Sequence, residues 1–238
     1  MRGGGPVTER SYNQFCPVAM AAEILCTRWT VVVLRELLAG SSRFNELRRG
    51  LPRVSPALLS QRLKELEEWG IVSRTPIPGE SGAHAYALTE AGEELKPLIE
   101  GFGKWGQRWI ASDLSLKQLD ATLLMWDMRR RLDFDPPPDH RRVIQFQYPD
   151  APKQDRNWWL ILQPECPVDL CSIDPGHDVD LYVTAPLRDM TAIWMGVDSV
   201  RKARSEDRLM LTGDRDLADT MEQWLLCSPF ATEERKVA

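Results

Sequence analysis

The stretch VSPALLSQRLKELEEWG, residues 54–70, constrains the fold most strongly because it defines one helix from its first residue to its last. Ser55 can cap this helix, Pro56 fits its first turn, and Gly70 can end it. Three leucines recur at helical spacing and predict one buried face. The opposite face of such a helix contacts either solvent, as in an ordinary helical bundle, or a polar partner. In the first two turns that face carries small or hydrogen-bonding side chains, namely Ala57, Ser60, Gln61 and Lys64.

The residues around this helix form an ordered set of elements. Three short helices are expected before it, over about residues 17–25, 27–40 and 43–50. The run IVSRTPIPGESGAHAYAL after it holds two strand-like segments around a Pro/Gly/Ser tip, which predicts a β-hairpin. A last helix follows, with Thr89 as its cap and Pro97 as a point where it kinks or restarts. This is the order of a winged helix-turn-helix, in which the second helix of the pair enters the DNA major groove.

The charge of the chain is unevenly distributed. A net charge of −5 argues against a wholly basic nucleic-acid binder, yet residues 24–64 hold eight Lys and Arg against two Asp and Glu. This local excess predicts a basic patch that contacts DNA phosphates, which gives affinity and position rather than sequence readout. The arginines expected in this role lie just before the polar-faced helix and are Arg43, Arg48, Arg49 and Arg53.

The helix itself carries the residue types that read bases. Small side chains at its start allow close approach to a groove, while hydroxyl, amide and ammonium groups can bond base edges. Arg62 lies at the edge of the apolar stripe, where it can bond either a phosphate or the protein itself. The DNA-binding residues expected from the helix and the hairpin are Ser55, Ala57, Ser60, Gln61, Arg62, Lys64 and Arg74.

Residues 16–110 resemble the HxlR family of bacterial winged-helix transcriptional regulators. The matching stretches are CPVAMAAEIL, RWTVVVLRELLAG, RFNELRRGLPRVSPALLSQRLKELEEWGIVSR and YALTEAGEELKPLIEGFGKWG. The resemblance implies a homodimer in which the terminal helices contribute to the dimer contact and two recognition helices read a palindromic double-stranded operator. One departure is the hairpin tip PIPGESGAH, which carries Glu80 and no Arg or Lys where the wings of this family are often basic.

Cys16 precedes Pro17 at the start of the first expected helix, whose positive end favours the reactive thiolate. It also matches the N-terminal cysteine that several members of the resembled family use to sense oxidants or electrophiles. The alternative is a small packed residue, as free cysteines usually are. Cys26 lies among apolar neighbours and is expected in the core. An odd total of five cysteines, without a secretory signal, predicts reduced thiols rather than disulfides.

The second half, residues 113–238, alternates short β-branched and aromatic runs with amphipathic helices, which predicts a separate α+β domain. The run DVDLYVTAPLRDMTAIWMG followed by RLMLTGDRDLADTMEQWL makes residues 119–228 resemble a sterol carrier protein. This resemblance implies a small sheet with helices over one face, often enclosing an apolar tunnel for hydrophobic compounds. The tryptophans that can line such a cavity, or simply fill the core, are Trp126, Trp158, Trp159, Trp194 and Trp224.

Enzymatic and membrane functions find little support in the sequence. It contains no G-x-G-x-x-G, P-loop or H-E-x-x-H motif, and Cys166, Cys171 and His177 fit no standard zinc spacing. No catalytic residue, cofactor or metal site is therefore expected. No apolar run approaches the roughly 20 residues of a membrane helix, and the N-terminus lacks an apolar signal core, so a cytoplasmic protein is expected.

The sequence thus predicts the α+β class, with an N-terminal winged helix-turn-helix domain and a C-terminal small α/β sheet domain resembling a sterol carrier protein. The expected divisions are a flexible tail over 1–15, the DNA-binding domain over 16–112, and a ligand-binding or support domain over 113–238. The predicted function is a dimeric, sequence-specific transcriptional regulator, modulated by a hydrophobic small molecule or by a thiol switch. The alternative is a hydrophobic-ligand carrier with incidental DNA affinity.

Overall fold

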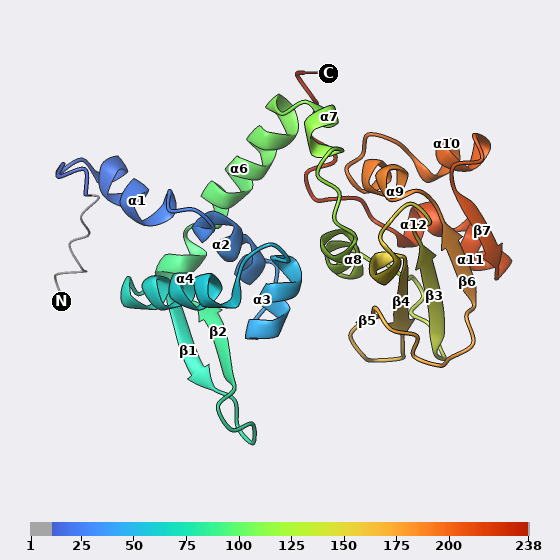
Figure 1. The fold of residues 1–238 in the computed structure, drawn as a ribbon, viewed down its shortest axis with the longest axis horizontal. Coiled ribbons are helices and arrows are strands. Elements are labelled where there is room, and N and C mark those ends of the chain that lie inside the picture. The colour runs from blue at the N-terminus through green and yellow to red at the C-terminus, as the bar shows by residue number, and fades with distance from the viewer. Residues whose placement is uncertain (1–10, 238) are drawn as a thin grey trace. The chain divides into compact units, whose positions relative to one another are not determined.

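The computed structural model describes residues 11–237, apart from the side chains of residues 114 and 115, and shows a mixed α+β protein (Figure 1). The chain divides into two compact units, one ending at Phe102 and the other beginning at Gly103. Most of the tail expected over residues 1–15 lies outside the described residues. Within the described part of that tail, Ser11 Oγ and the Tyr12 N–H both donate to Glu23 Oε1, at 2.7 Å each.

The first unit is a helix-turn-helix with a β-hairpin. The hairpin strands pair antiparallel from Val72 with Leu88 to Pro76 with His84. The elements are α1 (Pro17–Leu25), α2 (Thr30–Leu38), α3 (Phe44–Gly50), α4 (Pro56–Glu68), β1 (Val72–Pro76), β2 (His84–Leu88), α5 (Glu90–Glu93) and α6 (Lys96–Trp109).

Helix α4 forms as its sequence predicts. The Ser55 hydroxyl accepts a hydrogen bond from the Leu58 N–H at 3.3 Å, and Pro56 occupies the first turn. Leu59, Leu63 and Leu66 are at most 2% exposed and join the core made by the other helices of the unit. Burial of these leucines fixes the rotation of α4, and therefore which side chains face outward.

A buried carboxylate locks α2 against α3. Glu36 is fully buried, pairs with Arg35 at 2.5 Å and accepts a hydrogen bond from the Ser41 hydroxyl at 3.0 Å. Arg35 also donates to the Gly50 carbonyl at 3.0 Å. A Cβ at Gly50 would lie 2.0 Å from the Glu36 carboxyl group, so a larger residue would displace that buried group. Burying a charge is costly unless it is paired, which makes this arrangement specific to one packing of the two helices.

The last helix expected in this half is divided in two. Thr89 caps the short α5 by accepting from the Gly92 N–H, and α6 then starts anew at Lys96 with Pro97 in its first turn. Of the two outcomes considered for Pro97, a restart is therefore the observed one. Ile99 is buried, whereas Leu98 and Phe102 are 53% and 57% exposed.

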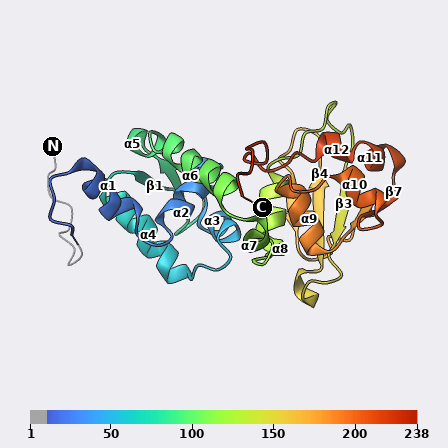
Figure 2. The same cartoon turned by 90° about the horizontal axis from the view of Figure 1, so that it is seen from above.

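The second unit is built on a five-stranded sheet in the order β5-β4-β3-β6-β7 (Figure 1), and Figure 2 shows the same elements from above. Strands β3 and β6 are parallel, and the other neighbouring pairs are antiparallel. After the C-terminal part of α6, the elements are α7 (Ser112–Ser115), α8 (Ala121–Arg129), β3 (Arg142–Gln147), η1 (Lys153–Asp155), β4 (Asn157–Leu162), β5 (Asp169–Cys171), β6 (Leu181–Thr184), α9 (Leu187–Trp194), α10 (Val200–Ser205), β7 (Met210–Gly213), α11 (Arg215–Asp219) and α12 (Met221–Trp224).

One face of this sheet carries the core of the second unit. Ile144, Leu160 and Val183 lie on that face and belong to one cluster with buried side chains of the helices, among them Met125 of α8 and Met190 of α9. Helices α8 to α12 all contribute to the cluster, so they pack on the same face of the sheet. This agrees with the expected separate domain built on a small sheet.

The C-terminal segment of the second unit packs on the end of α6. A Cβ at Gly103 would lie 2.2 Å from the ring of Phe230, so the ring rests directly on the helix backbone. The Lys236 N–H donates to the Arg108 carbonyl at 2.8 Å, and Arg108 forms an ion pair with Glu233. These contacts join residues that are 125 or more positions apart and were not anticipated from the sequence.

Among residues 11–237, no single helix is long and apolar enough to cross a membrane. Helices α1 and α2 reach the necessary length and apolarity only when taken together, and they are bent by 81° with respect to each other.

Candidate nucleic-acid interface

The outward face of α4 carries the side chains expected to read DNA. Ser55, Ala57, Ser60, Gln61 and Lys64 are all exposed, on the side away from the buried leucines. Their polar groups partly bond acids of the same helix. Gln61 Nε2 donates to Glu65 at 3.0 Å, and Lys64 Nζ lies 3.6 Å from Glu68. Exposed pairs of this kind contribute at most about 1 kcal/mol to the stability of the fold, so contacts with DNA can replace them.

The basic residues expected at phosphates lie around α3. Arg48 and Arg49 are in its last turn, Arg53 is in the connection to α4, and all three are exposed. Arg43 occupies the N-cap position of α3 and is held by the hairpin. Its Nη1 donates to both carboxylate oxygens of Glu80, at 2.7 and 2.9 Å. The hydrogen bonds and charge of Glu80 raise the pKa of Arg43 above its usual value.

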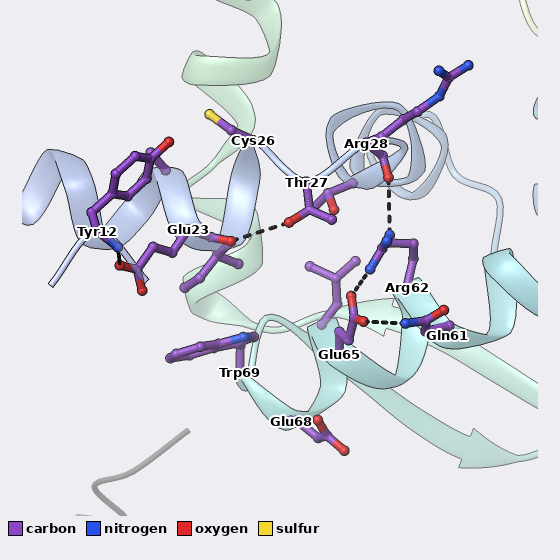
Figure 3. A pocket seen from close by; sticks show the side chains of 14 residues that line it. Tyr12, Glu23, Cys26, Thr27, Arg28, Gln61, Arg62, Glu65, Glu68 and Trp69 are labelled. Atoms are coloured by element: carbon purple, nitrogen blue, oxygen red, sulfur yellow. Dashed lines mark hydrogen bonds and ion pairs between the residues drawn. The ribbon is translucent and has the colours of Figure 1, made fainter. Parts of the chain in front are cut away.

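Arg62 does not lie with the outward-facing residues of α4. Its side chain is 14% exposed, donates through Nε to the Arg28 carbonyl at 3.1 Å, and pairs with Glu65 (Figure 3). Arg62 thus bonds the protein, one of the two roles considered for it, and a contact with a DNA phosphate stays a prediction. The contacts lie in a groove of about 590 Å³ lined by α1, the turn after it and one flank of α4. Glu23, Trp69 and Cys26 line the same groove.

The hairpin offers few charges to DNA. Arg74 on β1 is exposed, and its guanidinium lies 3.0 Å from His84 Nδ1 on the paired strand. The tip between the strands carries Glu80, whose carboxylate is the partner of Arg43. The tip of this hairpin is thus acidic and is bound to a cation at the start of α3.

Cys16 is the N-cap residue of α1 and is half-buried. None of the nine residues of α1, all of which the structure describes, is buried within this chain. Phe15 and Val18 on either side are 98% and 75% exposed, so Cys16 stands on an uncovered helix rather than in the core. Cys26, in contrast, was expected in the core and is exposed, because it lies in the turn between α1 and α2 rather than inside a helix. All five cysteines lie among the described residues and are free thiols.

The tryptophans proposed to line a cavity are packed in the second unit. Trp126, Trp158 and Trp224 belong to its core and are at most 5% exposed, and Trp194 packs against that core. The indole N–H groups of Trp158 and Trp224 donate to the Asp155 and Leu217 carbonyls, each at 2.8 Å. Trp159 is buried on the opposite face of the sheet. These contacts account for core packing, and a role in ligand binding stays a prediction.

Comparison with known proteins shows the family to which the sequence of the first unit is similar. Residues 24–114 match the family described as HxlR-like helix-turn-helix. The chain is 40% identical over 99 residues to the uncharacterized HTH-type transcriptional regulator YvaP of Bacillus subtilis, covering 41% of this chain and 92% of YvaP. The chain belongs to the HxlR-like helix-turn-helix family. A similar regulator of Synechocystis, sll1512, is 34% identical over 101 residues, covering 42% of this chain and 75% of that protein.

Solved structures of related regulators are also similar to part of this chain. The redox regulator HypR in its reduced form is 32% identical, with 39% of this chain and 91% of HypR covered and a TM-score of 0.37. The quinone-bound YodB of B. subtilis is 33% identical, with 38% of this chain and 96% of YodB covered and a TM-score of 0.34. The relatives of this HxlR-like protein are thus transcriptional regulators, and the family match ends at residue 114.

Proposed function

We propose that this HxlR-like protein is a sequence-specific transcriptional regulator that reads a double-stranded operator through α4. The observation that carries the proposal is the outward face of α4, where Gln61 and Lys64 stand exposed opposite the buried leucines. The flanking basic residues supply phosphate contacts, and the amide and ammonium groups supply base contacts. Membership in a family of helix-turn-helix regulators supports the same assignment.

A selection of bound fragments from random and genomic DNA tests this function. Enrichment of one palindromic motif, with at least about 1,000-fold preference over scrambled duplex, is the expected result for a specific regulator. Binding without enrichment of any motif would instead favour the alternative, a carrier of hydrophobic ligands whose DNA affinity is incidental.

The proposed regulator acts as a homodimer. The support in this chain is apolar surface that the first unit leaves uncovered: Phe15, Val18 and Met20 around α1, and Leu98 and Phe102 on α6 are all more than half exposed. Exposed apolar patches of this kind typically mark an interface. Sedimentation of the full chain at micromolar concentration should give a dimer, and Phe102→Glu should shift it toward the monomer.

The proposed signal is a hydrophobic compound bound by the second unit or a modification of Cys16. The arrangement of helices on one face of a small sheet supports the sterol-carrier-like reading of that unit. The uncovered position of Cys16 at the start of α1 supports the thiol switch. Native mass spectrometry of the full chain with added fatty acids, sterols and aromatic compounds tests the first possibility. Binding to any of these, followed by a change in operator affinity, would establish regulation by a ligand.

A further inference from the structure

The carboxylate of Glu80, in the tip of the hairpin, bonds Arg43, an arginine that is expected to contact the DNA backbone. Arg43 and Glu80 lie 37 positions apart, and Nη1 of Arg43 bonds both oxygens of the Glu80 carboxylate. Arginine recognises carboxylates and phosphates with the same N–H groups. We propose that Glu80 occupies on Arg43 the place of a DNA phosphate, so that it competes with DNA and sets the affinity of the regulator. This inference rests on the proposed DNA-binding function.

The backbone of the hairpin holds Glu80 where it can act in this way. The Tyr86 N–H donates to the Ser42 carbonyl at 2.7 Å, and Arg43 forms an antiparallel bridge with Ala85, so β2 is tied to the start of α3. At the tip, the Glu80 N–H donates to the Ile77 carbonyl and the Glu80 carbonyl accepts from the Ala83 N–H. Two successive turns therefore fix the backbone on both sides of Glu80.

The exposure of the pair makes it exchangeable. The side chains of Arg43 and Glu80 are 48% and 47% exposed, so water and salt reach both groups. An exposed ion pair contributes little to stability, and a phosphate can replace the carboxylate without a large cost. The remaining tip sequence, PIPGESGAH, offers no Lys or Arg that would compensate for the acid. The tip of this hairpin therefore lowers the electrostatic attraction of the protein for DNA, whereas a basic tip would raise it.

The test uses the full chain, a random-sequence duplex of about 30 base pairs and titrations at several salt concentrations, because phosphate contacts do not depend on sequence. Glu80→Gln should bind about two- to fivefold more tightly than the unmodified protein at fixed salt. Its slope of log K against log salt should be steeper by up to about 0.9, the value for one additional phosphate contact. Glu94→Gln, which removes the same charge from an exposed residue after α5, should change neither quantity.

A double-mutant cycle separates competition at Arg43 from general charge repulsion. If Glu80 acts through Arg43, Glu80→Gln should give no gain in an Arg43→Ala background. An equal gain in both backgrounds would overturn the inference, as would weaker binding by Glu80→Gln, which would mean that the pair persists in the complex. Absence of DNA binding by the unmodified protein would overturn the proposed function itself. Thermal unfolding of each variant serves as the check that the fold is retained.

Discussion

Helix α1 of the first unit and the core of the second unit place large apolar side chains in opposite environments. In the second unit, Trp126 and Trp224 are at most 2% exposed and are surrounded by a single core. In the first unit, Phe15 and Val18 are 98% and 75% exposed and no residue of α1, within the described chain, is buried. The difference is between these two regions and not between whole units, because the first unit also has a core of buried leucines and the second also exposes Trp105. The core of the second unit is filled by its own side chains, whereas α1 presents apolar surface of the kind that typically marks an interface.

Arg208 in the second unit and two surface cations in the first differ in the number of acids they bond. In the second unit, Arg208 bonds Asp189, Asp198 and Glu206, each at 2.6 Å. In the first unit, Arg43 and Lys64 each pair with one acid at the surface. Cations that bond several carboxylates organise loops within a unit, while exposed single pairs can be exchanged for another ligand.

The largest expected effect tests the difference between the core of the second unit and the exposed side chains around α1. Trp126→Ala should lower the free energy of unfolding by about 3–5 kcal/mol, because it empties a buried site and removes the ring beneath the Arg129 and Arg130 guanidinium groups. The matched change on the uncovered helix, Phe15→Ala, should cost less than about 0.5 kcal/mol at nanomolar protein concentration. Urea unfolding followed by circular dichroism measures both. Equal costs would remove the distinction between the core of the second unit and the uncovered helix α1.

A second change tests whether the first unit nevertheless has a rigid interior. Gly50→Ala should destabilise by about 1–3 kcal/mol because its Cβ would meet the buried Glu36 carboxyl group. The control is Gly101→Ala in α6, where a Cβ meets nothing within 4 Å and the better helix propensity of alanine should stabilise slightly. Thermal unfolding compares them, and a neutral Gly50→Ala would contradict the proposed lock between α2 and α3.

The DNA-facing residues should divide into two classes. Gln61→Ala and Lys64→Ala should each lose about 1–3 kcal/mol of preference for the operator, since both are placed to contact base edges. Arg48→Ala and Arg53→Ala should weaken operator and scrambled DNA alike and flatten the salt dependence. Titrations on the two duplexes distinguish these outcomes. An unchanged operator-to-scrambled ratio in both α4 variants would mean that α4 does not read the bases.

The smallest expected effect compares two cysteines, one from each unit. Cys16 should react several-fold faster than Cys227 with iodoacetamide at pH 7, since it stands at the start of an uncovered helix. Although Cys227 is exposed as a residue, its Sγ lies 3.5 Å from the Ile193 carbonyl, and desolvation raises the pKa of this thiol. A raised pKa means less thiolate at pH 7, so labelling of Cys227 should increase more on going to pH 9. Mass spectrometry of partly labelled protein ranks the sites, and a Cys16 that stays unlabelled would rule out the switch.

Local signals in the sequence were sufficient to define the elements of the interface. Ser55, Pro56 and the leucine spacing determined the start, the buried face and the exposed face of α4, and the Pro/Gly/Ser tip determined the hairpin. These signals work because caps, turns and helical periodicity involve residues only a few positions apart. The same local reasoning identified the separate sheet domain, through short strands bounded by Pro, Asp and Gly.

Only the tertiary structure decided which charges meet. The sequence left Arg62 with two possible partners, and packing of α4 beside the Arg28 turn showed that it bonds the protein. The sequence located Glu80 in the hairpin tip but did not predict its contact with Arg43. It also gave no sign that the last residues of the chain bond Arg108 of α6. Contacts across 37 or 125 positions depend on the directions in which several packed elements return the chain, and no short stretch of sequence encodes those directions.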